Sequence, residues 1–253
     1  DYREQGAGRL TGTLSQLSIP EARETSPVSP RLAPAASSPH RQLPVTDLTI
    51  ERLAYKQLDL GQLKLTASSK GGLWDAQLAV RNPDISLDGT IRWVAGDKGT
   101  PDGQTQTEFR AEAKTLEHGF ERLGFPGTLR RGTGNAQGKL SWTGAPTGID
   151  FASLAGNFEI EARDGQFNKL EPGVGRLLGI LSLQSIPRRI SFDFRDLFSQ
   201  GFAFDKIAGS FAVRQGVMTT DNLEVRGPAA KVAMRGQIDL GRETQNLSVR
   251  IQP

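Results

Sequence analysis

The sequence predicts an all-β fold with minor α content. Apolar and polar residues alternate over long stretches, such as residues 74–80 and 85–93, and helical periodicity is confined to short segments. The alternating stretches recur at intervals of about ten residues. This pattern is typical of antiparallel strands with one apolar and one solvated face. A sandwich, a barrel and an extended curved sheet all fit it, and periodicity alone does not choose among them.

Composition narrows the class of protein further. The chain has 253 residues, no cysteine and a first residue that is not methionine. No signal peptide and no run of about 18 apolar residues is present, so we expect a piece of a longer protein. The 31 basic and 28 acidic residues are interspersed, which indicates a solvated surface rather than a nucleic-acid interface.

Three regions follow from the composition along the chain. Residues 1–19 form a strand-containing N-terminal piece, because Leu10, Gly12 and Leu14 alternate with polar residues. Residues 20–44 are rich in proline, serine and alanine and predict a flexible loop or linker. Residues 45–253 carry the repeated strand pattern. Within them we expect a short helix at residues 116–125, with Phe120 and Leu123 turned inward, and a hairpin turn at Asp164-Gly165.

The stretch at residues 171–211 is the most apolar part of the chain. Residues 174–183 predict a helix that is apolar on almost all sides and too short to span a bilayer. Pro187 ends it, and Arg188 and Arg189 precede a strand in which Phe192 and Phe194 alternate with polar residues. The helix is either part of a core or a plug laid in an apolar groove or a membrane interface.

The same stretch carries a resemblance to a known family. The run GRLLGILSLQSIPRRISFDFRDLFSQGFAFD at 175–205, with TTDNL at 219–223 and GPAA at 227–230, resembles the C-terminal region of the AsmA-like family. LSWTGAP at 140–146 and LAYKQLDLGQLKL at 53–65 extend the resemblance over nearly all of the chain after residue 45. It implies a long antiparallel sheet curled into an open trough, a β-groove with an apolar concave face and short accessory helices.

The resemblance also implies a function. Proteins of this kind are expected to move phospholipid across the periplasm of Gram-negative bacteria, from the inner towards the outer membrane, with the lipid tails sliding along the apolar groove. The expected partners are phospholipids, the two membrane surfaces and envelope proteins, and the expected inner-membrane anchor lies outside this chain. The alternative is a non-catalytic periplasmic β-rich scaffold whose apolar face is a core and whose edge strands bind partners.

Few residues of this sequence are candidates for catalysis or metal binding. The two histidines, His40 and His118, lack a neighbouring metal or nucleophile motif, so we expect no catalytic residue, no metal and no cofactor. Acidic and basic residues near 188–205 are expected to form a solvated face. The residues expected to contact lipid share the apolar side of the predicted strands or helix. They are Trp74, Leu78, Val80, Leu87, Ile91, Trp93, Phe158, Ile160, Leu177, Leu178, Leu181, Phe192, Phe194, Phe211, Val232 and Met234.

Overall fold

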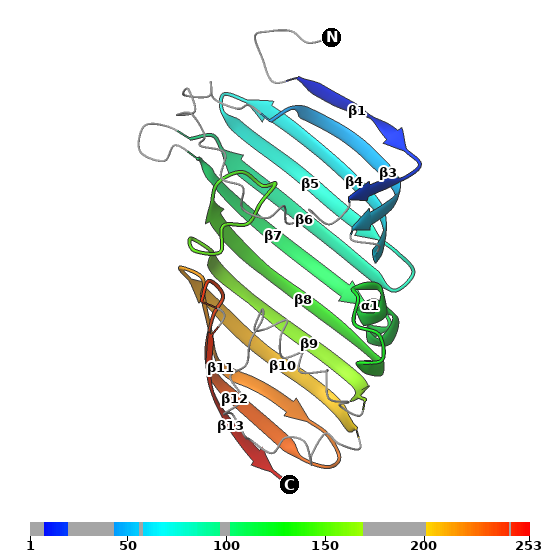
Figure 1. The fold of residues 1–253 in the computed structure, drawn as a ribbon, viewed down its shortest axis with the longest axis vertical. Helices are drawn as coiled ribbons and strands as arrows, with labels where there is room; N and C mark the ends of the chain where they lie inside the picture. Colours follow the sequence, from blue (N-terminus) through cyan, green and yellow to red (C-terminus); the bar gives the residue numbers. More distant parts are fainter. Residues whose placement is uncertain (1–7, 20–42, 56–57, 97–101, 169–200, 243) are drawn as a thin grey trace, which may run out of the picture.

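The computed structural model describes residues 8–19, 43–55, 58–96, 102–168, 201–242 and 244–253. In these residues one 13-stranded sheet and one helix form the fold (Figure 1). The predicted helix at 174–183 and all but the last two residues of the proline-rich segment lie outside the described residues. The strands are β1 (Arg9–Leu14), β2 (Leu17–Ile19), β3 (Val45–Tyr55), β4 (Leu58–Lys70), β5 (Leu73–Arg81), β6 (Ile85–Val94), β7 (Gln104–Ala113), β8 (Leu129–Thr143), β9 (Ala155–Phe167), β10 (Phe202–Arg214), β11 (Val217–Arg226), β12 (Lys231–Asp239) and β13 (Thr244–Gln252).

The sheet is open, and its strands follow the order of the chain. From β3 to β13 each strand pairs antiparallel with the next, and β1 and β13 form the two edges of the described sheet. β1 and β2 both pair with β3 in the parallel direction. The predicted all-β fold with a long antiparallel sheet is therefore confirmed, and the strands of the N-terminal piece belong to this same sheet.

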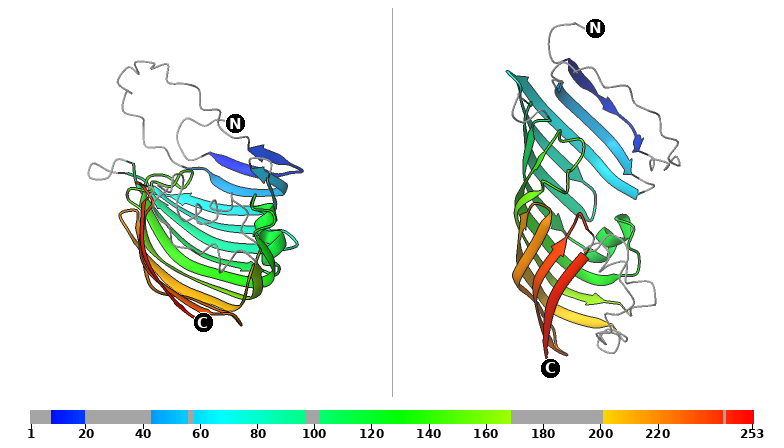
Figure 2. Two further views of the ribbon diagram at one scale, coloured as in Figure 1. Left: turned by 60° about the horizontal axis from the view of Figure 1, so that its bottom comes forward. Right: turned by 60° about the vertical axis from the view of Figure 1, so that its left-hand side comes forward.

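The two faces of the sheet differ in chemistry, as the alternation predicts. The register places Leu65 opposite Leu78, and the same row continues through Phe109 to Phe158 and Phe211. The flanking positions, such as Gln77 and Glu108, point to the other face because successive side chains in a strand alternate. Figure 2 shows the strands bending toward the side on which the helix lies.

Helix α1 (Leu116–Arg122) covers one border of the apolar face. The side chain of Leu116 lies where a Cβ on Gly134 would be, and Ile85 of β6 packs beneath Gly119. Leu58 of β4 approaches the end of the helix at Gly124. The helix thus crosses the strand ends from β8 to β4, and we call this border the helix rim. The prediction that Phe120 turns inward is confirmed, whereas Leu123 is 43% exposed and that prediction is wrong.

The opposite ends of the strands form a second border, the loop rim. Residues 144–154, which connect β8 to β9, extend along it: Ala145 packs with the tryptophans of β5 and β6, and Leu154 packs with β10 and β11. Backbone hydrogen bonds join successive turns, with Ala95 N donating to Gly72 O (2.7 Å). Gly144 N likewise donates to Gly103 O and Gly216 N to Leu154 O, both at 2.9 Å. These bonds hold the turns in one continuous border.

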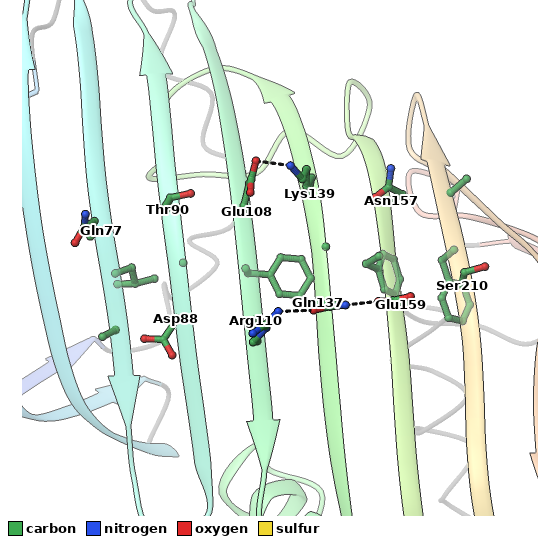
Figure 3. A pocket seen from close by; sticks show the side chains of 18 of the residues that line it. Gln77, Asp88, Thr90, Glu108, Arg110, Gln137, Lys139, Asn157, Glu159 and Ser210 are labelled. Atoms are coloured by element: carbon green, nitrogen blue, oxygen red, sulfur yellow. Dashed lines mark hydrogen bonds and ion pairs between the residues drawn. The ribbon is translucent and has the colours of Figure 1, made fainter.

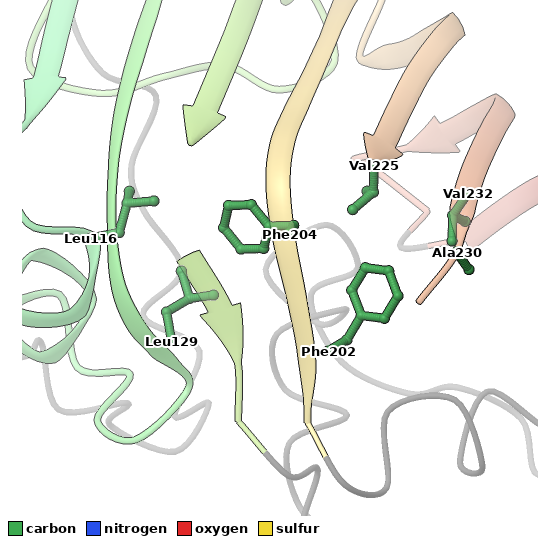
Figure 4. Packing of buried hydrophobic residues seen from close by; sticks show 7 residues of the cluster. All are labelled: Leu116, Leu129, Phe202, Phe204, Val225, Ala230 and Val232. Carbon is green, nitrogen blue, oxygen red and sulfur yellow. The ribbon is translucent and has the colours of Figure 1, made fainter. Parts of the chain in front are cut away.

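Buried apolar side chains gather beneath the two rims. Beneath the helix rim, Phe202 and Phe204 of β10 are 1% and 2% exposed (Figure 4). Their cluster contains Leu116, Leu129, Val225, Ala230 and Val232. Two further clusters lie toward the loop rim, one around Phe211 and Trp142 and one around Trp74 and Trp93. The sheet is therefore packed at its borders.

The predicted hairpin at Asp164-Gly165 is wrong, because both residues lie inside β9. Asp164 adopts a left-handed conformation with φ 54°, and Arg131 of the neighbouring strand β8 has φ 56°. Arg131 pairs with Gly165, so the two distortions are adjacent in the sheet. A local distortion of this kind changes which side chains face the core. The pairing of β10 with β9 is interrupted at the same place, between Phe204↔Gly165 and Lys206↔Arg163, and Phe204 and Ile207 pack in one cluster although they are three residues apart.

The ring of Phe204 explains why residue 165 is glycine. A Cβ on Gly165 would lie 2.4 Å from Cζ of Phe204. We expect Gly165→Ala to lower the free energy of unfolding by about 1–3 kcal/mol, because the buried ring would have to move. Urea unfolding measures this, with Gly148→Ala as the control, since a Cβ there meets nothing within 4 Å. Equal stability of the two variants would contradict the packing described here.

Candidate functional site

The candidate site is the apolar surface between the two rims, which we call the central strip. Its side chains are half-buried, whereas those beneath the rims are buried. No charged residue lies in the rows that form it from β4 to β10. The strip consists of Leu63, Leu65, Leu78, Val80, Leu87, Ile91, Phe109, Ala111, Ala136, Leu140, Phe158 and Ile160, with glycines at 89, 138, 156 and 209 between them.

The dimensions of the strip suit an extended apolar ligand. It crosses seven strands, and a spacing of about 4.8 Å between neighbouring strands gives a length of about 29 Å. Three rows of side chains, each about 6.7 Å from the next, give a width of about 13 Å between the outer rows. The hydrocarbon layer of a bilayer is about 30 Å thick and holds two leaflets, so the strip is longer than one acyl chain.

The structure places the residues that the sequence predicted to contact lipid on this one face, wherever they are described. Leu78, Val80, Leu87, Ile91, Phe158 and Ile160 lie in the central strip. Trp74, Trp93, Phe211 and Val232 are buried in the clusters beneath the rims, and Met234 packs against one of these clusters. The remaining five, Leu177, Leu178, Leu181, Phe192 and Phe194, lie outside the described residues.

The three tryptophans of the chain lie in one row at the loop rim. Trp74 pairs with Trp93, and Thr105 stands between Trp93 and Trp142. The indole Nε1 of Trp74 donates to Pro44 O at 2.9 Å, and Nε1 of Trp142 donates to Ala145 O at 3.3 Å. Each tryptophan is at most 6% exposed. Trp74 and Trp93 therefore support the border of the strip rather than its open surface.

Sequence reasoning missed four large side chains of the strip: Leu63, Leu65, Phe109 and Leu140. Phe109 is the most informative, because its partners in the sheet are Gly89 on one side and Gly138 on the other. Neither glycine has a side chain that could cover the ring of Phe109. The signal was present in the alternation, but the pairing that places Phe109 between two glycines is not visible in the sequence.

The opposite face of the sheet is polar and carries a groove of about 1280 Å³ (Figure 3). Side chains of β4 to β11 form its walls, and the strand positions between them, including Gly89 and Gly138, form its floor. Lys139 Nζ lies 2.6 Å from Glu108 Oε1. Arg110, Gln137 and Glu159 form a hydrogen-bonded chain across three strands. An acyl chain in this groove would displace water from charged groups, so the groove does not suit lipid tails.

Two carboxylates of the polar face have pKa values shifted by ion pairs. Lys206 and then Arg163 lower the pKa of Glu161, and Lys231 and then Arg226 lower the pKa of Glu224. Each carboxylate is thus held in its charged form by two cations. Carboxylates of this kind lack the raised pKa of a general acid, and the pairs are best explained as links between neighbouring strands.

One buried carboxylate, Asp84, lies at the helix rim in the turn between β5 and β6. Its side chain is 12% exposed, and its Oδ2 accepts a hydrogen bond from Arg122 Nε of α1 at 2.6 Å. Nδ1 of His118, one turn earlier in α1, lies 3.3 Å from Asp84 Oδ1. The hydrogen bond from Arg122 lowers the pKa of Asp84 despite its burial, and the contact with His118 acts in the same direction.

This ion pair predicts a pH-dependent contribution to stability. The pKa of Asp84 in the folded state is lowered from 3.8. The charged carboxylate therefore stabilises the fold above pH 3.8, and this stabilisation is lost as the pH falls through the lower folded-state pKa. We expect Asp84→Asn to cost about 1–3 kcal/mol at neutral pH, and the difference from the unsubstituted chain to shrink below about pH 4. Urea unfolding across this range tests it. A difference that is independent of pH would contradict the ion pair.

The described residues contain no group of three histidine, cysteine, aspartate or glutamate residues that could hold a metal ion. Within the same residues, no helix is long and apolar enough to cross a membrane. His118, which the sequence left without a role, serves as a partner of Asp84.

The fold and the strip define the class of protein: an open, curved β-sheet with one apolar face bounded by two covered rims. The chain belongs to the YhdP protein family, whose profile matches residues 1–253. It is similar to the intermembrane phospholipid transporter YhdP of Escherichia coli strain K12, with 27% identity over 231 residues. The alignment covers 86% of this chain and 18% of that relative. No solved structure matches the chain.

Proposed function

We propose that this chain forms part of a phospholipid conduit in which the acyl tails lie along the central strip and the headgroup stays in water. The observation that carries this proposal is the apolar surface from β4 to β10, in whose three rows Thr107 is the one polar residue, on the face opposite cross-strand ion pairs such as Lys139–Glu108. In addition, the similar protein of Escherichia coli is an intermembrane phospholipid transporter.

Elementary energetics supports an apolar strip as a carrier of lipid. Exposing an acyl chain of about 16 methylenes to water costs roughly 0.8 kcal/mol per methylene, or on the order of 10 kcal/mol. Contact with the strip removes much of this penalty along its whole length. Since no point of the strip offers a charged or strongly polar partner, the free energy varies little as a tail slides along it. Movement then requires no chemical step and no catalytic residue.

The wider setting is part of the same proposal. The conduit carries phospholipid through the periplasm from the inner towards the outer membrane, as part of a longer protein whose membrane anchor lies elsewhere in its sequence. Its partners are phospholipids, the surfaces of the two membranes and envelope proteins that hold it in place. The name of the relative, which states transport between membranes, supports this setting.

A second candidate function is a β-rich scaffold that acts through its edge strands. The observation that favours it is that β1 and β13 are the outermost strands of the described sheet. Edge strands present backbone groups that can pair with another chain. In this case the apolar face would be covered by protein rather than by lipid.

Mass spectrometry of the purified chain distinguishes the two functions. The chain is expressed in a Gram-negative host, purified without detergent and extracted for lipids. The conduit predicts co-purified phospholipid in a defined ratio to protein, and this ratio falls when apolar residues of the strip are replaced by charged ones. Absence of phospholipid, together with capture of a partner protein through an edge strand, would overturn it in favour of the scaffold.

A further inference from the structure

Helix α1 borders the central strip directly. Leu116 and Phe120 belong to the packing beneath the helix rim, and Gly119 rests on Ile85 of β6. The next row of side chains on the sheet, two residues further along each strand, contains Leu87 and Ala111 of the strip. A movement of α1 would therefore change how much apolar surface is open at that border.

Polar contacts at both ends of α1 add to its apolar packing. At its start, Leu116 packs over Gly134, and Oε2 of Glu117 accepts a hydrogen bond from Arg131 N at 2.8 Å. One turn apart, His118 and Arg122 converge on the carboxylate of Asp84. A helix of seven residues is not stable alone, so these contacts determine where it lies.

The segment after α1 has contacts of its own, since Leu58 approaches Gly124 and Gly127 O accepts a hydrogen bond from Asn168 Nδ2 at 2.8 Å. Gly124 and Gly127 have positive φ values of 89° and 69°, and no atom lies within 4 Å of a Cβ placed on Gly127. Asp84 itself is well fixed, because its backbone N–H donates to Asn82 Oδ1 at 3.0 Å and its carbonyl accepts from Lys114 N at 2.8 Å. The turn is thus a fixed anchor, and the carboxylate of Asp84 is its polar link to α1.

We propose that Asp84 is a positioning residue of the lipid path: its carboxylate orients α1 on the sheet through His118 and Arg122 and so fixes the helix-rim border of the central strip. This inference rests on the proposed function. Asp84 does not contact lipid. It acts through Arg122 and His118, and its loss frees the end of α1 to shift over the strip.

The first test compares Asp84→Asn with a matched control, Asp88→Asn. Asp88 also pairs with an arginine, Arg81, at 2.5 Å, but its side chain is 60% exposed and lies on the polar face. Both variants of the full chain are purified, and phospholipid per folded protein is measured well below the unfolding temperature. We expect Asp84→Asn to lower the ratio three- to tenfold and Asp88→Asn to leave it unchanged.

A disulfide across α1 separates positioning from a general loss of stability. The chain has no cysteine, so Ile85→Cys with Gly119→Cys introduces a single thiol pair. Cγ1 of Ile85 lies 3.2 Å from a Cβ placed on Gly119, and a cysteine Sγ can take this γ position, so the two positions are close enough to be joined. In the Asp84→Asn background, we expect the oxidised pair to restore phospholipid content and reduction to remove it again.

The outcomes separate this inference from the conduit itself. Phospholipid in the unsubstituted chain with unchanged content in Asp84→Asn would overturn the role of Asp84 and leave the conduit standing. The role of Asp84 is likewise overturned if the disulfide forms without restoring the phospholipid content. It is also overturned if the two thiols fail to form a disulfide in the chain that retains Asp84. Absence of phospholipid from the unsubstituted chain would overturn the conduit and this inference together.

Discussion

Replacing Leu78 by aspartate is expected to lower the phospholipid content of the purified chain roughly tenfold or more. Leu78 is half-buried in the middle of the central strip, between Leu65 and Gly89. A carboxylate there keeps its water and displaces at least two methylenes of a tail. Each displaced methylene costs about 0.8 kcal/mol of binding free energy. The loss from two methylenes exceeds the roughly 1.4 kcal/mol that changes a binding constant tenfold. The content is measured by mass spectrometry against protein concentration.

The fold is expected to survive this substitution at a cost of about 1 kcal/mol, because the strip is open. Gln77→Asp is the matched control, since Gln77 is the adjacent residue on the polar face, and it should change neither lipid content nor stability. Phe211→Asp gives the contrasting result. Phe211 is 5% exposed, so an unpaired charge there should destabilise the chain by several kcal/mol. If Leu78→Asp unfolds the chain as Phe211→Asp does, the strip is a closed core and not a lipid path.

The largest expected loss of stability from truncation is at Phe204. Its side chain is 2% exposed, covers Gly165 and lies with its ring centroid 5.3 Å from that of Phe167. Phe204→Ala removes these contacts and leaves a cavity, which costs about 3–5 kcal/mol in protein cores. Urea unfolding monitored by circular dichroism measures the loss.

Phe109→Ala is the control for Phe204→Ala. Phe109 is half-buried in the strip between two glycines, so its truncation removes fewer contacts. We expect a smaller loss of stability together with a loss of bound lipid. Similar losses of stability for the two substitutions would mean that the strip is packed as tightly as the region beneath the helix rim, which would contradict its assignment as an open surface.

The strands and the two faces of the sheet could be predicted because alternate residues of a half-buried strand differ in polarity. Leu78 and Val80 on one side and Gln77 and Arg81 on the other are sufficient to assign β5. The helix at α1 was predicted as well, since Gly124 and Pro126 mark its end. Local patterns of this kind depend only on neighbours in the sequence, which is why they could be read directly.

The predictions that failed depend on non-local geometry. The Asp164-Gly165 pair has the composition of a hairpin turn. However, β9 pairs with β8 and β10 on both sides of these two residues, so they form a local distortion within β9. Asp84 follows an Asn-Pro pair and looks like an ordinary turn residue. Its partners lie 34 and 38 residues further along the chain, so no local signal marks it.

The candidate site was likewise predicted in its local features and not in its non-local ones. The apolar face was predicted residue by residue, whereas its boundaries were not. Trp74 and Trp93 share the face with Leu78, yet residues 144–154 and the turns of the loop rim bury them. Nothing in the sequence indicated that Ala145 would reach the tryptophan cluster.

Photocrosslinking at two neighbouring residues of β9 tests whether lipid occupies the apolar face. Ile160 lies in the strip, and Glu159 is the adjacent residue on the polar face, where it lines the polar groove. Photoreactive residues at the two positions lie on the same strand and differ only in the face of the sheet to which they point. A conduit along the strip predicts crosslinked phospholipid from position 160 in Gram-negative cells and none from position 159. Capture of protein alone at position 160, or equal capture of lipid at both positions, would contradict it.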